Sequence, residues 1–179
     1  MPPFDETWQG PHLKPLQAPH PPIVMTGSQA TSPTLAEAGR RGLWPLSNGM
    51  ATDVQREHWR TYRDAALAAG HAPRRADWFV CRNFMVADTD EAAFDLAVNG
   101  EMGRLWREHQ LGLTRKLGLL GQLLPGVEPD EVTVDALARD LWLVGSPTTV
   151  AAKVERLYEA LGGFGTLVTV TYNYGDRSD

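Results

Sequence analysis

The stretch from residue 76 to residue 89, ADWFVCRNFMVADT, constrains the fold more than any other part of the chain. Successive side chains of a strand point to opposite faces of a sheet, and here both alternating sets are largely apolar. One set includes Trp78 and Val80, and the other includes Phe79 and Met85. A strand that is apolar on both faces is typical of a parallel sheet that is covered on both sides. The sequence therefore predicts a buried parallel strand here.

Helices and further strands alternate with this strand along the chain. Three shorter apolar runs are predicted strands, at residues 23–26, 43–46 and 166–172. The segments between them have apolar residues at helical spacing, and such alternation predicts an α/β fold with a parallel sheet. Four strands form either a small open sheet or half of a barrel. An eight-stranded βα barrel needs about 250 residues, so the 179 residues of this chain are too few to close one.

Capping residues indicate where the first two helices begin and end. Ser32 followed by Pro33 is typical of a helix start, and Gly42 is expected to end that helix. Thr52 or Asp53 is expected to cap the second helix.

Two further helix starts follow the buried strand. The pattern from Asp88 to Glu91 resembles a capping box, and Ser146 is expected to cap the last helix. Residues 90–140 between these starts are predicted to be a long insertion, helical at first. The repeated prolines of residues 1–22 predict an extended lead-in, which leaves residues 23–179 as the folded unit.

Composition argues against several classes of protein. Hydrophobic residues make up 42% of the chain and charged residues 22%, which is typical of a globular domain. The formal net charge of −5 argues against nucleic acid as the main partner, because phosphate backbones require a basic face. The sequence has no apolar run of membrane-spanning length and no visible secretory signal. Its single cysteine, Cys81, is expected in a reducing cytoplasm. The five histidines lack metal-ligand spacing, so no metal site is expected.

A turn of small polar residues follows the first predicted strand. Residues 27–31 read GSQAT, and the next helix begins directly after them. Ser28 and Thr31 offer hydroxyl donors, Gly27 permits close backbone approach, and the helix N-terminus adds free amides. These features together indicate a phosphate site, although the same residue types are common in ordinary turns.

Two other places put polar residues beside apolar strands. Ser47 and Asn48 follow the second strand and are expected at the same edge of the sheet as the first turn. Arg82 and Asn83 interrupt the buried strand. A buried arginine needs a partner, so Arg82 is expected either to face the site or to pair with a carboxylate.

Several stretches resemble the luciferase-like flavin-dependent monooxygenases, especially the limonene- and alkanal-monooxygenase-like branch. They read PHPPIVMTGSQATSPTLAEAGRRGL, NGEMGRLWREHQLGL and VTVDALARDLWLVGSPTTVAAKVERLYEALGGFGTL. The resemblance covers roughly residues 10–176. It implies a (β/α)8 TIM barrel of which this chain is the C-terminal half, strands five to eight, with a helical insertion after strand seven.

The resemblance also implies an activity. Members of the family use reduced FMN and O2 to oxygenate a small apolar substrate such as a terpene or an aldehyde, and a separate NAD(P)H-dependent reductase supplies the flavin. By this resemblance Gly27, Ser28 and Thr31 hold the FMN phosphate, and Ser47 is a further cofactor contact. A deazaflavin is an alternative cofactor within the superfamily. The resemblance nominates no catalytic residue.

Half a barrel leaves two alternatives to an active enzyme. The chain is then either a non-catalytic flavin-binding relative or an inactive truncated product. Because half a barrel exposes two sheet edges, a homo-oligomer is expected in either case.

Overall fold

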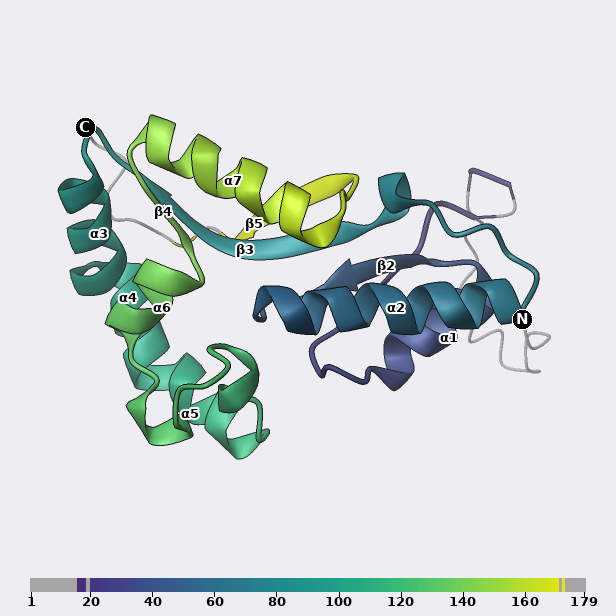
Figure 1. Ribbon diagram of the computed structural model, residues 1–179, viewed down its shortest axis with the longest axis horizontal. Coiled ribbons are helices and arrows are strands. Elements are labelled where there is room, and N and C mark those ends of the chain that lie inside the picture. Colours follow the sequence, from purple (N-terminus) through teal and green to yellow (C-terminus); the bar gives the residue numbers. More distant parts are fainter. Residues whose placement is uncertain (1–15, 19, 171, 173–179) are drawn as a thin grey trace, which may run out of the picture.

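The computed structural model describes residues 16–18, 20–170 and 172, and Figure 1 shows how its elements are arranged. The predicted lead-in at residues 1–22 lies largely outside these residues. Five parallel strands form the described sheet: β1 (Val24–Gly27), β2 (Trp44–Ser47), β3 (Phe79–Val86), β4 (Leu143–Gly145) and β5 (Thr166–Val170). The α/β fold with a parallel sheet is therefore confirmed.

β3 is the strand on which the sheet is assembled. Its beginning pairs with β2, residues 79–83 pair with β5, and residues 84–86 pair with β4. β1 pairs with β2 along its whole length. In Figure 1, β3 runs along the molecule and joins the part that contains β2 to the part around β4.

The sequence predicts four strands, and the structure corrects this number because β4 is an additional one. β4 has only three residues, too few for an alternating pattern to reveal it. It pairs with the last residues of β3, whose polar backbone groups would otherwise lack strand partners.

The helices fill the connections between strands. They are α1 (Pro33–Arg41), α2 (Thr52–Ala68), α3 (Asp90–Asn99), α4 (Glu101–Leu105), α5 (Leu111–Lys116), α6 (Val134–Asp140) and α7 (Pro147–Leu161). The segment predicted to be an insertion, for which we keep the name insertion as a label only, folds into α3 to α6 and forms a separate lobe at one end of β3 (Figure 1).

Three of the predicted helix boundaries are confirmed. Ser32 caps α1, because its Oγ accepts a hydrogen bond from the Leu35 amide at 3.3 Å. Gly42 ends the same helix in the left-handed conformation, with a φ of 66°. Ser146 caps α7 by accepting a hydrogen bond from the Thr149 amide at 3.4 Å.

Two other predicted caps are wrong. α2 begins after Ala51, which has no capping side chain, and neither Thr52 nor Asp53 stands at the cap position. α3 is capped by Thr89 rather than by Asp88, because the Thr89 hydroxyl accepts a hydrogen bond from an amide of the first turn at 3.1 Å.

Asp90, at the start of α3, instead joins the insertion to α7. Its carboxylate accepts hydrogen bonds from the Ser146 amide at 2.6 Å and from the Thr149 hydroxyl at 2.9 Å. These bonds, led by the one from the Ser146 amide, hold the pKa of Asp90 below its usual value. The insertion is thus tied to the last helix as well as to β3.

Two apolar clusters stabilise the described chain. One cluster joins α1, α2 and α7 to one face of the sheet, which we call the helix side. Leu35, Trp59, Leu157 and Val80 belong to it. The other cluster joins the insertion to the end of β3 and to β4, with Trp142 and Trp106 packed at 5.2 Å between ring centroids.

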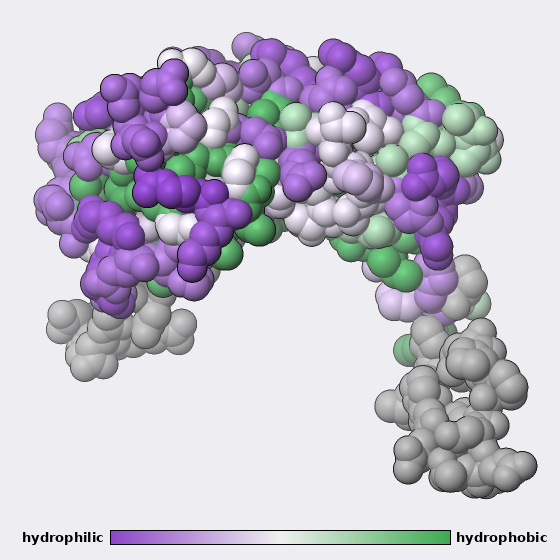
Figure 2. All heavy atoms as spheres, turned by 90° about the horizontal axis from the view of Figure 1, so that it is seen from below, coloured by the Kyte–Doolittle hydropathy of each residue, from purple (hydrophilic) through white to green (hydrophobic). Residues whose placement is uncertain are grey.

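Among the described residues, no helix covers the opposite face of β1, β2 and the first half of β3, and we call this face the open side. Val24, Trp44 and Phe79 lie there, and the rings of Trp44 and Phe79 stack with centroids 5.8 Å apart. Val24 is exposed and the two aromatic residues are partly exposed. Figure 2 shows an arched molecule with hydrophobic residues gathered along its concave side.

Within the described part of the chain, no helix combines the length and the apolar character needed to cross a membrane.

Close packing of α1 on α2 predicts the effect of one substitution. A Cβ at Gly39 would lie 2.4 Å from the Tyr62 carbonyl oxygen, which belongs to rigid helix backbone. We therefore expect Gly39→Ala to lower the free energy of unfolding by about 1–3 kcal/mol, measured by urea denaturation. Gly112→Ala is the control. A Cβ at Gly112 meets nothing within 4 Å, so alanine should raise helix stability there by about 0.5–1 kcal/mol. Equal midpoints for Gly39→Ala and the wild type would contradict this packing.

Candidate functional site

Two polar turns lie side by side at the carboxyl ends of β1 and β2. The Asn48 side-chain amide donates a hydrogen bond to Ser28 Oγ at 3.2 Å, and the Asn48 backbone amide donates to the Gly27 carbonyl at 2.9 Å. Parallel strands place their carboxyl ends at one edge, so the juxtaposition predicted from the sequence is present.

The first turn has donors that the protein leaves available. Ser28 is half-buried and Thr31 is exposed. Ser28 Oγ accepts from Asn48, which leaves its own hydroxyl proton free to be donated elsewhere. The backbone amides of Gln29 and Thr31 have no acceptor among the described residues. These donors adjoin the N-terminus of α1, whose positive dipole end favours an anion.

Gly27 has a packing role. A Cβ there would lie 2.4 Å from Leu35 Cδ1 and 2.8 Å from Ser32 Oγ. Glycine therefore allows α1 to approach β1, and its missing side chain faces the helix side. The close backbone approach that the sequence suggests is realised against α1.

Ser47 is buried on the helix side of β2. Its Oγ accepts a hydrogen bond from Trp78 Nε1 at 2.9 Å, and Ser47 has no exposed surface. The residue beside Ser28 is thus Asn48. A contact between Ser47 and a cofactor stays a prediction that none of its described contacts supports.

Residues far away in the sequence hold both turns in place. His58 Nε2 lies 2.7 Å from the Gln29 carbonyl oxygen, and the Gln55 side-chain amide donates to the Asn48 carbonyl at 2.8 Å. Gln122 of the insertion accepts from the Ala30 amide at 2.7 Å through its side-chain oxygen. Sequence reasoning missed these three residues. The sequence of α2 contains one signal that could have revealed two of them, because Gln55 and His58 are polar residues at positions that face the core.

His58 is fully buried, and this fixes its chemical form. Burial lowers its pKa below the usual value of 6.5, so the ring is neutral at neutral pH. The Gln29 carbonyl can only accept, so the proton is on Nε2. Nδ1 then has no partner among the described residues.

The two polar residues in β3 lie on opposite faces. Asn83 Oδ1 accepts a hydrogen bond from the Tyr172 hydroxyl at 2.9 Å. The hydroxyl oxygen of Tyr172 in turn accepts one from Trp106 Nε1 at 3.0 Å. Asn83 is thereby linked to the insertion. Arg82 points to the helix side, and no carboxylate within 4.0 Å pairs with it in the described chain. Arg82 therefore forms no ion pair within the described chain, and it does not lie at the two turns, so neither of the two expectations for this residue is met.

No cluster of three or more histidine, cysteine, aspartate or glutamate side chains within the described residues has the geometry of a metal site. The chemistry that the two turns offer is hydrogen bonding to an anion.

Comparison with known sequences identifies the family. The sequence profile of the luciferase-like monooxygenases matches residues 4–163. The chain belongs to the luciferase-like monooxygenase family. The resemblance found in the sequence is therefore confirmed.

Named relatives align with most of this chain. The chain is 34% identical over 158 residues to 3,6-diketocamphane 1,6-monooxygenase of Pseudomonas putida, covering 87% of this chain and 42% of the relative. It is 29% identical over 162 residues to limonene 1,2-monooxygenase of Rhodococcus erythropolis, covering 86% and 39%.

A solved structure has the same fold. The oxygenating constituent of 3,6-diketocamphane monooxygenase from Pseudomonas putida, a type II Baeyer-Villiger monooxygenase in complex with FMN, superposes with a TM-score of 0.81 and 34% identity. The match covers 87% of this chain and 43% of that protein. The chain thus spans less than half the length of the relatives it matches.

The neutral state of His58 predicts a pH dependence of stability. The unfolded chain binds a proton at His58 below about pH 6.5, whereas the folded chain resists it, so the free energy of unfolding falls as the pH drops through this range. The slope contributed is at most about 1.4 kcal/mol per pH unit. His58→Gln should flatten the dependence measured by urea denaturation between neutral and mildly acidic pH.

His109→Gln is the matched control, because His109 is exposed and its side chain has no hydrogen bond or ion pair with another described residue. It should leave the pH dependence unchanged. A wild-type profile that His58→Gln does not alter would contradict the neutral, buried state of His58.

Proposed function

We propose that this chain forms the C-terminal half of the catalytic barrel of an FMN-dependent monooxygenase and provides the phosphate end of its flavin site. In this proposal β1, β2, β3 and β5 are strands five to eight, and α3 to α6 are the insertion after strand seven. The chain covers 43% of the FMN-bound relative, and its sheet has one helix-covered face and one open side, as half a barrel would.

The observation that supports the proposal best is the pair of turns at residues 27–31 and 47–49. They place hydroxyl and amide donors beside the N-terminus of α1, with no carboxylate side chain in either turn. A phosphate monoester such as that of FMN fits this donor set, because its oxygens accept hydrogen bonds and its charge favours a helix N-terminus.

Each residue has a defined task in holding the phosphate. Ser28 and Thr31 would hold the phosphate through their hydroxyl groups, and the free amides of the turn would add further donors. Asn48 donates to Ser28 Oγ, which directs the Ser28 proton away from Asn48 and toward the ligand. His58, Gln55 and Gln122 act on the turn backbones and are positioning residues.

The reaction that we propose is the one implied by the family. Bound FMN, when reduced by a separate NAD(P)H-dependent reductase, supplies the reactivity with O2 that the protein's own side chains lack. The substrate that we infer is a small apolar organic molecule, since the named relatives are diketocamphane and limonene monooxygenases. The role of this chain is to bind and orient the cofactor while a complete barrel excludes water.

A non-catalytic flavin-binding protein is the second candidate. It is favoured by the support that α2 and the insertion, both part of this chain, give to the two turns through His58, Gln55 and Gln122. The partly exposed Trp44 and Phe79 on the open side also favour association with another half-barrel or with a second copy.

A comparison of FMN with riboflavin tests the phosphate site directly. We expect the chain to bind FMN at least tenfold more tightly than riboflavin in a fluorescence titration, because the two ligands differ only in the phosphate. Ser28→Ala and Thr31→Val should each reduce this preference by about threefold to tenfold. Riboflavin affinity should stay unchanged.

Thr148→Val is the control for Thr31→Val, because Thr148 is exposed in the first turn of α7, away from both turns. It should keep the wild-type preference. Equal affinity of the wild-type chain for FMN and riboflavin would show that the turns do not bind the phosphate.

A further inference from the structure

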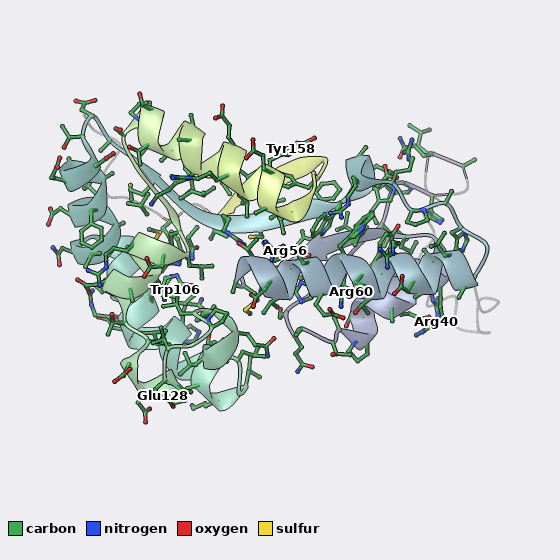
Figure 3. All side chains as sticks on the ribbon, viewed as in Figure 1. Arg40, Arg56, Arg60, Trp106, Glu128 and Tyr158 are labelled. Carbon is green, nitrogen blue, oxygen red and sulfur yellow. The ribbon has the colours of Figure 1, made fainter. Side chains whose placement is uncertain are left out.

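A cavity of about 620 Å³ lies on the helix side of β3, away from the two turns. It is bounded by the N-terminal end of α2, by α7 and by the segment around β4. Arg56 of α2 joins this helix to α7 near the cavity, since its Nε donates to the carbonyl of Ala160, a lining residue, at 2.8 Å. Figure 3 shows Arg56 at the end of α2 that faces α7. No residue of the turns at 27–31 and 47–49 lines the cavity.

Arg82 reaches this cavity from β3 as a buried charge without a counterion. The residue is 2% exposed, and it has no ion pair within the described chain. Its Nη1 donates to the Cys81 carbonyl at 3.1 Å and its Nη2 reaches the Thr52 hydroxyl at 3.5 Å. The other three of its five N–H donors have no acceptor among the described residues.

The guanidinium remains charged in this setting. Burial lowers the pKa of Arg82 to about 10, which is still far above neutral pH. A buried charge is costly unless an opposite charge or strong acceptors compensate for it. A group that compensates the charge of Arg82 must therefore lie in the cavity that this residue lines.

The N-terminus of α2 adds a second positive feature at the same place. Ala51 and Thr52 line the cavity, and Ala51 provides no capping side chain. The amides of Thr52 and Asp53 have no acceptor among the described residues. The Asp53 carboxylate accepts from the Val54 amide and does not line the cavity. A helix N-terminus beside an arginine is a repulsive arrangement unless an anion lies between them.

The remaining charged residues of the cavity are also mostly basic. Lys153, Arg156 and Arg139 line it together with a single acid, Asp140. None of the four forms an ion pair within 4.0 Å in the described chain. Lys153 Nζ donates to the Val144 carbonyl at 3.0 Å, and burial, followed by the nearby charge of Arg156, lowers its pKa.

We propose that this cavity binds a small organic anion whose carboxylate or phosphate group pairs with Arg82 and the first amides of α2. A planar guanidinium suits both kinds of oxyanion, because it can donate two parallel hydrogen bonds. The apolar body of the ligand lies against Leu123, Leu141 and Leu157, which line the rest of the cavity. The volume is in the range of small-molecule sites and exceeds what a bare ion needs. This site is separate from the phosphate turns and does not depend on them.

Calorimetric titration with hexanoate, hexyl phosphate and hexan-1-ol tests the proposal. We expect at least one of the two anions to bind the wild-type chain, and hexan-1-ol to bind at least tenfold more weakly because it lacks the charge. Arg82→Met should weaken anion binding at least tenfold. A preference for hexanoate or for hexyl phosphate identifies the head group. Arg60→Met is the control, since Arg60 is exposed on α2 and pairs with Glu57, and it should bind like the wild type.

Thermal unfolding without ligand gives an independent readout. Arg82→Met should unfold at the same temperature as the wild type or higher, because it removes an uncompensated buried charge. If this variant fails to fold, two measurements on folded protein decide. Arg156→Gln, at the exposed rim, should weaken anion binding about twofold to fivefold in a salt-dependent manner. The Nε–H resonance of Arg82, assigned in the wild type, should shift on anion addition.

Three results would overturn the proposal. The first is the absence of anion binding to the wild type up to about 10 mM, the range in which weak specific sites are still detected. The second is equal anion affinity of wild type and Arg82→Met. The third is anion binding that leaves the Arg82 Nε–H resonance unchanged.

Discussion

The whole structure depends on the pairing of β3 with three other strands. β3 is long enough to pair with β2 and β5 through its first half and with β4 through its second half. The first half positions the sheet that carries the two polar turns, and the second half anchors the insertion. Its apolar residues contribute to both clusters, through Val80 in one and Met85 in the other. Loss of this strand would separate the insertion from the site that it supports.

α2 contacts both proposed sites. Along its buried face, Gln55 and His58 bond to the backbones of the two turns. Its uncapped N-terminus faces the cavity that contains Arg82. The turns bind phosphate in our proposal because the turn before α1 has free donors beside the positive end of that helix. The cavity binds an anion because the start of α2 and Arg82 are both positive. One physical rule, that a helix N-terminus favours negative charge, underlies both proposals.

Local sequence signals predicted the parts of the structure that have local causes. The double apolar pattern of β3 and the caps at Ser32, Gly42 and Ser146 each depend on residues close together in the chain. β4 was missed because it exists only through pairing with β3. The cap of α2 could not be placed from local sequence, because the Ala51 amide donates to the carbonyl of Gln122, a residue distant in the sequence that lies beside the start of that helix. The contacts of His58, Gln55 and Gln122 with the turns also join residues that are distant in the sequence, so local patterns could not predict them. Local patterns could not predict the side of β3 to which Arg82 points either. The packing of α1 against Gly27 depends on Leu35 and could not be predicted from the turn alone, whereas contact of Gly27 with a phosphate stays a prediction.

The central claim is that the turn between β1 and α1 holds the phosphate of FMN. The most direct measurement is an amide NMR titration of the chain with FMN, followed by the same titration with riboflavin. We expect the Gln29 and Thr31 amide resonances to shift strongly with FMN, as free amides do when they gain an anionic acceptor, and to shift barely with riboflavin. Shifts that are the same for both ligands, or that leave Gln29 and Thr31 unaffected while FMN binds, would contradict it.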